Sequence, residues 1–212
     1  MNGFLFLSEA YRASDPNYDG RVTVPVFWDT KMNRIVTNSD DDLMRMLNSE
    51  FVQFATADHD FYPAALREEI DALNDTIYQD VNTGVYRAGF ATRQQPYERA
   101  VRRLFETLDE LDGRLATQRY LLGNSSTETD WRLFVTLLRF DAVYHGHFKC
   151  NLRRIVDYQN LWPYVRDLDQ HDGVAETVNL DHIKRHYYVT HEQINPTRLV
   201  PLGPLLDLDA LP

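Results

Sequence analysis

The residue type best suited to covalent chemistry occurs once in this sequence, as Cys150. Lys149 precedes it and His147 stands three residues before it, and nearby positive charge lowers the pKa of a thiol and so raises its thiolate fraction. A nucleophilic cysteine is therefore one interpretation of this segment. The other is a buried structural thiol packed against Phe148, because free cysteines are often buried and then inert.

Histidines near this cysteine suggest a second chemistry, metal binding. The spacing His145-x-His147-x-x-Cys150 supplies ligand types that zinc accepts. His182 and His186, four residues apart, share one face of a predicted helix. No glutamate follows His182 as in a zinc-protease motif, and no fourth ligand can be named. We therefore favour hydrogen-bonded histidines around an aromatic pocket and predict no metal site.

Two strands and a helix are expected at the start of the chain. Residues 21–28 alternate apolar and polar side chains, which predicts a half-buried strand, and a turn over 29–33 leads to a second strand over 34–37. Pro25 has no amide hydrogen, so it marks an edge, a bulge or a cis bond. Ser39, with Asp42 three residues later, predicts a helix start. The expected apolar face of that helix is Leu43, Leu47, Phe51 and Phe54.

From residue 63 the pattern is helical. Pro63 suits a first helical position, and an apolar stripe follows it as far as Gly84. Pro96 opens a longer helix with apolar residues in alternate steps of four and three: Tyr97, Val101, Leu104, Leu108, Leu111 and Leu115. Thr127 and Asp130 predict a capped helix that runs through Phe140. Shorter helices are expected at about 160–171 and 174–188, before an extended tail from Asn195.

The composition indicates a globular protein, with 43% hydrophobic and 25% charged residues in a chain of 212. The net charge of −10 argues against nucleic acid and anionic membrane as partners. No apolar run approaches the roughly 20 residues of a membrane helix. A single cysteine excludes an internal disulfide framework and fits a reducing compartment, so we expect a cytoplasmic protein.

Four runs of sequence are distinctive: FLSEAYRASDPNYDGRVTVPVFWD, DTIYQDVNTGVYRAGFAT, RFDAVYHGHFKCN and TVNLDHIKRHYYVTHEQINPT. They resemble the glutathionyl-hydroquinone reductases, also called xi-class glutathione transferases. NTGVYRAGFAT and HFKCN are the most specific parts of these runs. The resemblance implies a mainly α fold: a glutathione-transferase-type helical domain over 58–212, preceded over 1–57 by the second, C-terminal half of a thioredoxin-like α/β domain.

The resemblance also implies a reaction, the removal of glutathione from glutathionyl-hydroquinones. In the family a cysteine thiolate attacks the substrate sulfur, and a second glutathione resolves the mixed disulfide. That cysteine belongs to a Cys-Pro-Trp-Ala motif in a first βαβ unit, which takes roughly 30 residues or more. About 20 residues precede the first predicted strand here, and none is cysteine. We therefore expect the nucleophile to be absent from this chain and Cys150 to be structural.

Two dipeptides match the family's thiol-binding positions. Val24-Pro25 matches a cis-proline turn whose preceding residue pairs through its backbone with the cysteinyl part of glutathione; an edge-strand proline without a ligand is the alternative. Ser39-Asp40 stands where the family normally has Glu-Ser for the γ-glutamyl group, and the alternative is a solvated helix cap. Because Asp41 and Asp42 add negative charge, the expected co-substrate is glutathione or a related γ-glutamyl thiol.

Tyr86 and Tyr187 match tyrosines that the family directs at the hydroquinone. A ring stacks on a small aromatic substrate, and a phenolic hydroxyl bonds the substrate oxygen or acts as a general acid. Tyr188 is adjacent and points elsewhere on its helix. The resemblance further implies a homodimer formed through the helical domain. A second hypothesis keeps the fold without catalysis, as a module that binds small aromatics or dimerises.

Overall fold

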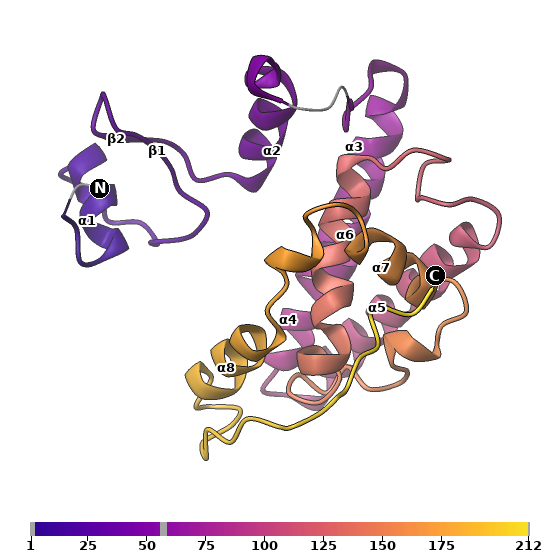
Figure 1. The fold of residues 1–212 in the computed structure, drawn as a ribbon. Helices are drawn as coiled ribbons and strands as arrows, with labels where there is room; N and C mark the ends of the chain where they lie inside the picture. The colour runs from indigo at the N-terminus through magenta and orange to yellow at the C-terminus, as the bar shows by residue number, and fades with distance from the viewer. Residues whose placement is uncertain (1–2, 56–58, 212) are drawn as a thin grey trace. The chain divides into compact units, whose positions relative to one another are not determined.

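The computed structural model describes residues 3–55 and 59–211 and divides the chain into two compact units, one ending at Tyr62 and one starting at Pro63 (Figure 1). The predicted boundary between residues 57 and 58 lies outside the described residues. No helix in the described part of the chain is long and apolar enough to cross a membrane.

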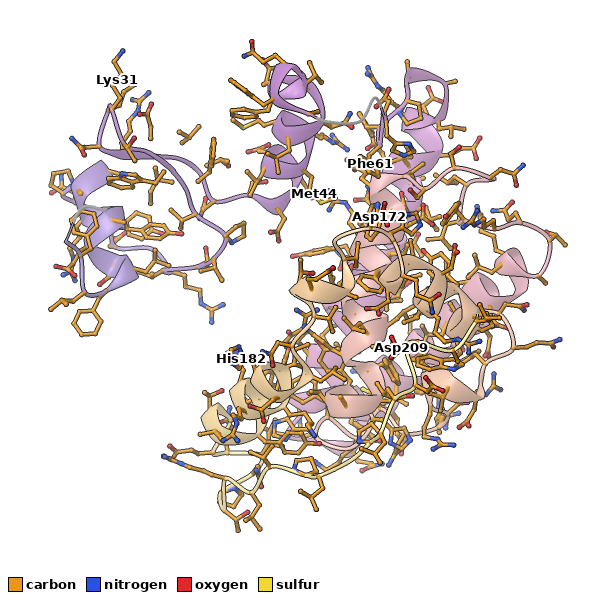
Figure 2. The ribbon with its side chains drawn as sticks, in the orientation of Figure 1. Lys31, Met44, Phe61, Asp172, His182 and Asp209 are labelled. Carbon is orange, nitrogen blue, oxygen red and sulfur yellow. The ribbon has the colours of Figure 1, made fainter. Side chains whose placement is uncertain are left out.

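The first unit holds a hairpin between two helices. Its elements are α1 (Leu7–Ser14), β1 (Phe27–Asp29), β2 (Arg34–Thr37), α2 (Asp40–Ser49) and the 3₁₀ turn η1 (Val52–Phe54). β1 and β2 are antiparallel, with Phe27 opposite Thr37. The Asp29 carboxylate accepts the backbone N–H groups of Lys31 and Met32, at 2.8 and 2.9 Å, and so shapes the turn whose tip carries Lys31 (Figure 2). The predicted turn and second strand are confirmed.

Two predictions for this unit were wrong in extent. The first strand begins at Phe27, and Val22 and Val24 are 44% and 77% exposed rather than half-buried. Among the described residues β1 pairs with β2 alone, and β2 is four residues long, so alternation upstream of Phe27 meets no partner strand. Helix α2 ends at Ser49, which leaves Phe54 outside it and 74% exposed.

The second unit is helical. Its elements are η2 (Ala64–Leu66, 3₁₀), α3 (Arg67–Thr76), η3 (Ile77–Asn82, π-helical), α4 (Gly84–Gly89), α5 (Gln94–Leu115), α6 (Glu128–Arg139), η4 (Phe140–Tyr144, π-helical), η5 (Ile155–Asp157, 3₁₀), α7 (Leu161–Asp169), η6 (Ala175–Thr177, 3₁₀) and α8 (Leu180–Thr190). α3 and α6 lie side by side (Figure 1). Pro63 caps the 3₁₀ turn η2 instead of opening an α-helix, and the last predicted helix is divided between η6 and α8.

The core of this unit follows the predicted seam of α5. Leu104 and Leu108 are fully buried there, and Leu111 is 2% exposed. Other side chains without exposed surface come from distant elements: Ile70, Ile77, Leu121, Leu133, Phe140, Phe148, Leu161 and Leu168. The chain makes turns over residues 192–197 after α8 and is extended from there, so the extended tail predicted from Asn195 begins a few residues later. It returns to the end of α7 (Figure 1), where the Gln170 side-chain amide donates to the carbonyls of Leu208 and Ala210 at 2.7 and 2.9 Å.

Candidate functional site

Three tyrosine hydroxyls from three separate elements meet in the second unit. The Tyr187 hydroxyl, from α8, lies 2.5 Å from that of Tyr86 on α4 and 2.9 Å from that of Tyr144 in η4. The sequence matched Tyr86 and Tyr187 to a substrate site, and the structure brings them into direct contact. Tyr144 was not predicted, although it stands in one of the runs that carry the family resemblance.

The burial of the three tyrosines determines which hydroxyl donates and which accepts in each hydrogen bond of this row. Tyr144 is 2% exposed and Tyr187 6%, whereas Tyr86 is 37% exposed. Three hydroxyl protons share two hydrogen bonds, so one proton remains for a group outside the cluster. If Tyr144 or Tyr187 held that proton, it would be buried without an acceptor, which is costly. Tyr144 therefore donates to Tyr187, Tyr187 donates to Tyr86, and the Tyr86 proton is available to a ligand.

The electrostatics keep the inner hydroxyls protonated. Burial raises the pKa of both Tyr144 and Tyr187 above the ordinary value, and the neighbouring tyrosines raise that of Tyr144 further. A protonated phenol donates a hydrogen bond and does not act as a base. The cluster is therefore suited to bind and stabilise an oxygen that carries negative charge, such as that of a phenolate.

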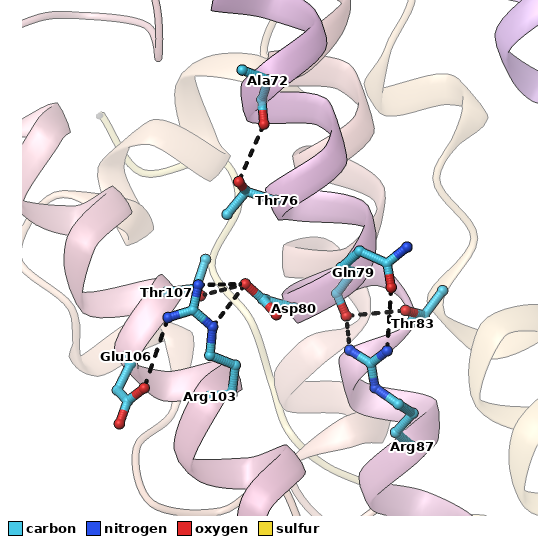
Figure 3. Close-up of polar contacts among 9 residues, drawn as sticks. All are labelled: Ala72, Thr76, Gln79, Asp80, Thr83, Arg87, Arg103, Glu106 and Thr107. Carbon is cyan, nitrogen blue, oxygen red and sulfur yellow. Dashed lines mark hydrogen bonds and ion pairs between the residues drawn. The ribbon is translucent and has the colours of Figure 1, made fainter.

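The element that carries Tyr86 is fixed by polar contacts (Figure 3). Asp80 in η3 accepts two bonds from the Arg103 guanidinium of α5, at 2.8 and 2.9 Å, and one from the Thr107 hydroxyl at 3.3 Å. The Gln79 carbonyl accepts from the Thr83 hydroxyl at 3.0 Å and from the Arg87 guanidinium. These contacts join η3 to α5 on one side and to α4 on the other.

Phe148 packs against the rings of the tyrosine cluster. It is fully buried, its ring stacks on Tyr144 with centroids 5.5 Å apart, and it meets Tyr86 edge-on at 5.4 Å. The close approach depends on Gly89 in α4, because a Cβ atom there would lie 2.2 Å from the Phe148 Cγ. The aromatic rings expected from the sequence therefore pack at distances that a side chain at Gly89 would disturb.

Cys150 lies near Phe148 and Val85 and has no access to solvent. Its exposure is 0%, and its Sγ lies 3.9 Å from the carbonyl oxygen of Phe148 and 4.0 Å from that of Val85. Burial raises the pKa of the thiol to about 12, so the thiolate is not formed at neutral pH. The prediction of a buried thiol packed against Phe148 is confirmed.

The histidines considered as metal ligands make other contacts. In residues 3–55 and 59–211, no three His, Cys, Asp or Glu side chains are grouped as metal ligands. His147 pairs with His191, not with Cys150, and their ring nitrogens Nε2 and Nδ1 lie 3.2 Å apart. His182, seen on α8 in Figure 2, and His186 both lie at the surface.

The predicted thiol-binding residues lie in the first unit, where one network holds their segments together. The Tyr11 hydroxyl donates to the Thr23 carbonyl at 2.8 Å. The Asn38 amide donates to the Tyr11 hydroxyl at 3.1 Å and to the Thr23 hydroxyl at 3.2 Å. Thr23, directly before Val24-Pro25, is thus hydrogen-bonded to Asn38, directly before Ser39. The Val24-Pro25 bond is cis, as the sequence suggested, and the Val24 side chain is exposed.

Ser39 caps helix α2. Its hydroxyl oxygen accepts the backbone N–H of Asp42 at 3.2 Å, and its own N–H donates to the Thr37 hydroxyl at 3.1 Å. The predicted helix start at Ser39 is confirmed, and the Ser39 hydroxyl proton remains available to a ligand carboxylate. A hollow of about 380 Å³ opens beside β2 and α2, with Thr37 and Asp42 in its lining.

Comparison with known proteins identifies the family. Residues 94–167 match the family model described as "Glutathione S-transferase, C-terminal domain". The chain is 50% identical over 211 residues to glutathionyl-hydroquinone reductase PcpF of Sphingobium chlorophenolicum, covering 100% of this chain and 67% of that protein. The glutathione-bound structure of YqjG from Escherichia coli superposes with a TM-score of 0.95 at 50% identity, covering 97% of this chain and 67% of that one.

A xi-class transferase from Natrialba magadii is similarly close, with a TM-score of 0.95 and 51% identity over 97% of this chain and 63% of that one. The chain spans about two thirds of the length of these relatives, and 62% of YqjG as a full protein. The mainly α fold with a transferase-type helical domain is thereby confirmed.

Proposed function

The chain belongs to the glutathionyl-hydroquinone reductases, and we propose that it serves their reaction by binding the hydroquinone ring at Tyr86, Tyr144 and Tyr187. The observation that carries this proposal is the directed chain of hydroxyls, which ends in one exposed donor. A hydroquinone offers a phenolic oxygen to that donor and a flat ring to the aromatic side chains around it.

The hydroxyl chain has a specific use in removing a thiol from an aromatic ring. The reacting form is the keto tautomer of the substrate, in which the ring carbon that carries sulfur has taken up a proton from the hydroxyl and is tetrahedral. Attack of a thiolate on the sulfur forms a disulfide and breaks the carbon–sulfur bond, and the electron pair of that bond becomes the ring enolate, a hydroquinone phenolate with its negative charge on a ring oxygen. Tyr86 donates a hydrogen bond to such an oxygen. Because Tyr86 accepts a bond from Tyr187, which in turn accepts one from Tyr144, the Tyr86 hydroxyl is a stronger donor. The thiolate itself comes from a group other than Cys150, whose thiol is buried and protonated.

The first unit is proposed to hold the thiol as the second half of a thioredoxin-like domain. The backbone of Val24 before Pro25 would pair with the cysteinyl part, and Ser39 and Asp40 would bind the γ-glutamyl carboxylate and ammonium. Glutathione or a related γ-glutamyl thiol fits this set. Dimerisation through the helical domain and a cytoplasmic location accompany the proposal as predictions from the family. The family comparison favours this enzymatic role over a module that only binds aromatics.

Calorimetric titration of the 212-residue protein with 1,4-hydroquinone, in oxygen-free buffer, tests the proposal. Tyr86→Phe removes the terminal donor, so its affinity should fall about three- to tenfold, the effect of one hydrogen bond. Tyr187→Phe breaks the chain and should have a similar effect. Tyr78→Phe is the matched control, since Tyr78 lies in η3 but is 55% exposed. Equal affinity in all four proteins would contradict the proposal.

A second assay addresses the nucleophile. The 212-residue protein should not turn over a glutathionyl-hydroquinone, because its single cysteine has no exposed surface. Turnover that disappears in Cys150→Ser would contradict both this expectation and the structural role of Cys150.

A further inference from the structure

Two histidines with no part in the proposed chemistry lie beside the tyrosine cluster. His147 Nε2 and His191 Nδ1 are 3.2 Å apart, and the two rings are nearly parallel, at 22° with centroids 5.4 Å apart. His147 is 5% exposed. His191 is partly exposed. At this distance the two facing nitrogens form a hydrogen bond only when one of them carries a proton and the other does not.

His191 stands where α8 ends, four residues after Tyr187. Its N–H donates to the Tyr187 carbonyl at 3.3 Å. Its ring meets Phe90, the residue that follows α4, edge-on at 5.1 Å and stacks on Phe148 at 5.7 Å and 15°. One imidazole therefore contacts α4 and the 147–148 segment, the two parts of the chain that also border the tyrosine cluster.

His147 is held from a second direction. Its ring lies 4.6 Å from that of Tyr188 on α8, and the Tyr188 hydroxyl interacts with the His147 backbone. The hydroxyl fits because Gly146 has no side chain: a Cβ atom there would lie 3.2 Å from it. Tyr188, which the sequence left without a role, thus fixes one member of the pair.

The pair keeps its hydrogen bond unless both rings are protonated. The titratable groups that face it are Lys149 beside His147, His186 beside His191, and the phenols of Tyr187 and Tyr188. At the end of α4 the contact is Phe90, which does not titrate. None of these groups is an anion at neutral pH. Two protonated rings would therefore place two N–H groups and two positive charges face to face with no counter-charge among them.

We propose that His147 and His191 are positioning residues for phenol binding: their hydrogen bond holds the end of α8 so that the Tyr187 hydroxyl stays between Tyr144 and Tyr86. The hydrogen bond between the two histidines breaks when both rings are protonated. The end of α8 is then no longer held, and the Tyr187 hydroxyl loses its position between Tyr144 and Tyr86. This inference rests on the proposed function, since it is read out by phenol affinity. Burial, with His191, lowers the pKa of His147 to about 4, and burial lowers that of His191, so the bond is intact at neutral pH.

The test uses substitutions that match the two nitrogens. Glutamine places an amide group near the position of histidine Nε2, and asparagine places one near Nδ1, so the double variant His147→Gln/His191→Asn keeps a hydrogen bond that does not titrate. His191→Phe keeps the ring and its stacking but removes the bond. Affinity for 1,4-hydroquinone is measured by calorimetry from pH 7.5 down to pH 4, with circular dichroism at each pH to identify unfolded samples.

We expect His191→Phe to bind about three- to tenfold more weakly than wild type at pH 7.5, and the double variant to bind within about twofold of wild type. Wild-type affinity should fall as the pH drops from 6 to 4, whereas that of the double variant should stay constant. If Tyr187→Phe weakens binding but His191→Phe does not, the inference fails and the proposed function stands. If Tyr187→Phe has no effect, the proposed function itself fails. Should His191→Phe not fold, identical pH profiles of wild type and double variant would overturn the inference.

Discussion

Replacing Asp130 by asparagine should destabilise the second unit more than any surface substitution. This carboxylate, 0% exposed, accepts four hydrogen bonds. The N–H and hydroxyl of Thr127 donate to Oδ2 at 2.7 and 3.0 Å, and the Leu121 N–H and Tyr164 hydroxyl donate to Oδ1, both at 2.9 Å. Asp130 thereby caps α6 and also ties it to α7 and to the loop that precedes it.

The magnitude follows from what an amide at this position cannot accept. The asparagine side chain has one acceptor oxygen, so its NH₂ group would face a backbone N–H of either Leu121 or Thr127. A buried donor without an acceptor costs about 1–3 kcal/mol, and the remaining bonds lose the contribution of the charge. Together these give about 3–5 kcal/mol, the range for removing one partner from a buried charged network. For a chain of this size that is a fall in Tm of roughly 10 °C.

Urea unfolding followed by far-ultraviolet circular dichroism is the assay, since most of the helices belong to this unit. Asp172→Asn is the matched control because Asp172 is exposed (Figure 2), and it should unfold within about 0.5 kcal/mol of wild type. A loss below about 1 kcal/mol for Asp130→Asn, with an unchanged slope against urea, would refute the argument that all four bonds require a carboxylate.

Three further predictions concern the surroundings of the tyrosine cluster. Cys150 should not react with a thiol reagent in the native protein and should react on unfolding, because it has no exposed surface and burial raises its pKa to about 12; rapid native labelling would contradict this. Gly89→Ala should cost about 1–3 kcal/mol in a denaturant titration because its Cβ would overlap Phe148, whereas Gly113→Ala, with open space around it, should be neutral or stabilising. His147 has a pKa of about 4 when folded and about 6.5 when unfolded, so the unfolded chain binds more protons between these values and stability should fall by about 3 kcal/mol as the pH drops from 6.5 to 4; in His147→Gln this part of the slope should be absent.

Local signals of the sequence predicted much of the helical unit. The cap formed by Thr127 and Asp130 depends on residues three apart, and the seam of α5 depends on a regular apolar spacing, so both could be read directly. The β1–β2 turn is local in the same way, since Asp29 bonds amides two and three residues later. The length of the first strand, in contrast, was not determined by local sequence signals. Apolar alternation over 21–26 resembles a strand, but strand formation requires a partner, and the periodicity contains no information about one.

The tyrosine cluster shows the same limit at the site itself. Helical spacing places residues on a face only while each turn has 3.6 residues, and two π-helical segments, η3 and η4, interrupt that spacing beside the cluster. Each segment has a wider bond, from the Thr83 N–H to the Tyr78 carbonyl and from the His145 N–H to the Phe140 carbonyl. A wider turn shifts the residues that follow it around the helix, so the periodicity that predicts the seam of α5 does not predict that Tyr144 turns toward Tyr187. π-Helical turns occur frequently at functional sites. Here η3 lies directly before α4, the helix of Tyr86, and η4 contains Tyr144. The position of the Tyr144 hydroxyl, the innermost of the three, therefore depends on a π-helical segment that the sequence pattern did not predict.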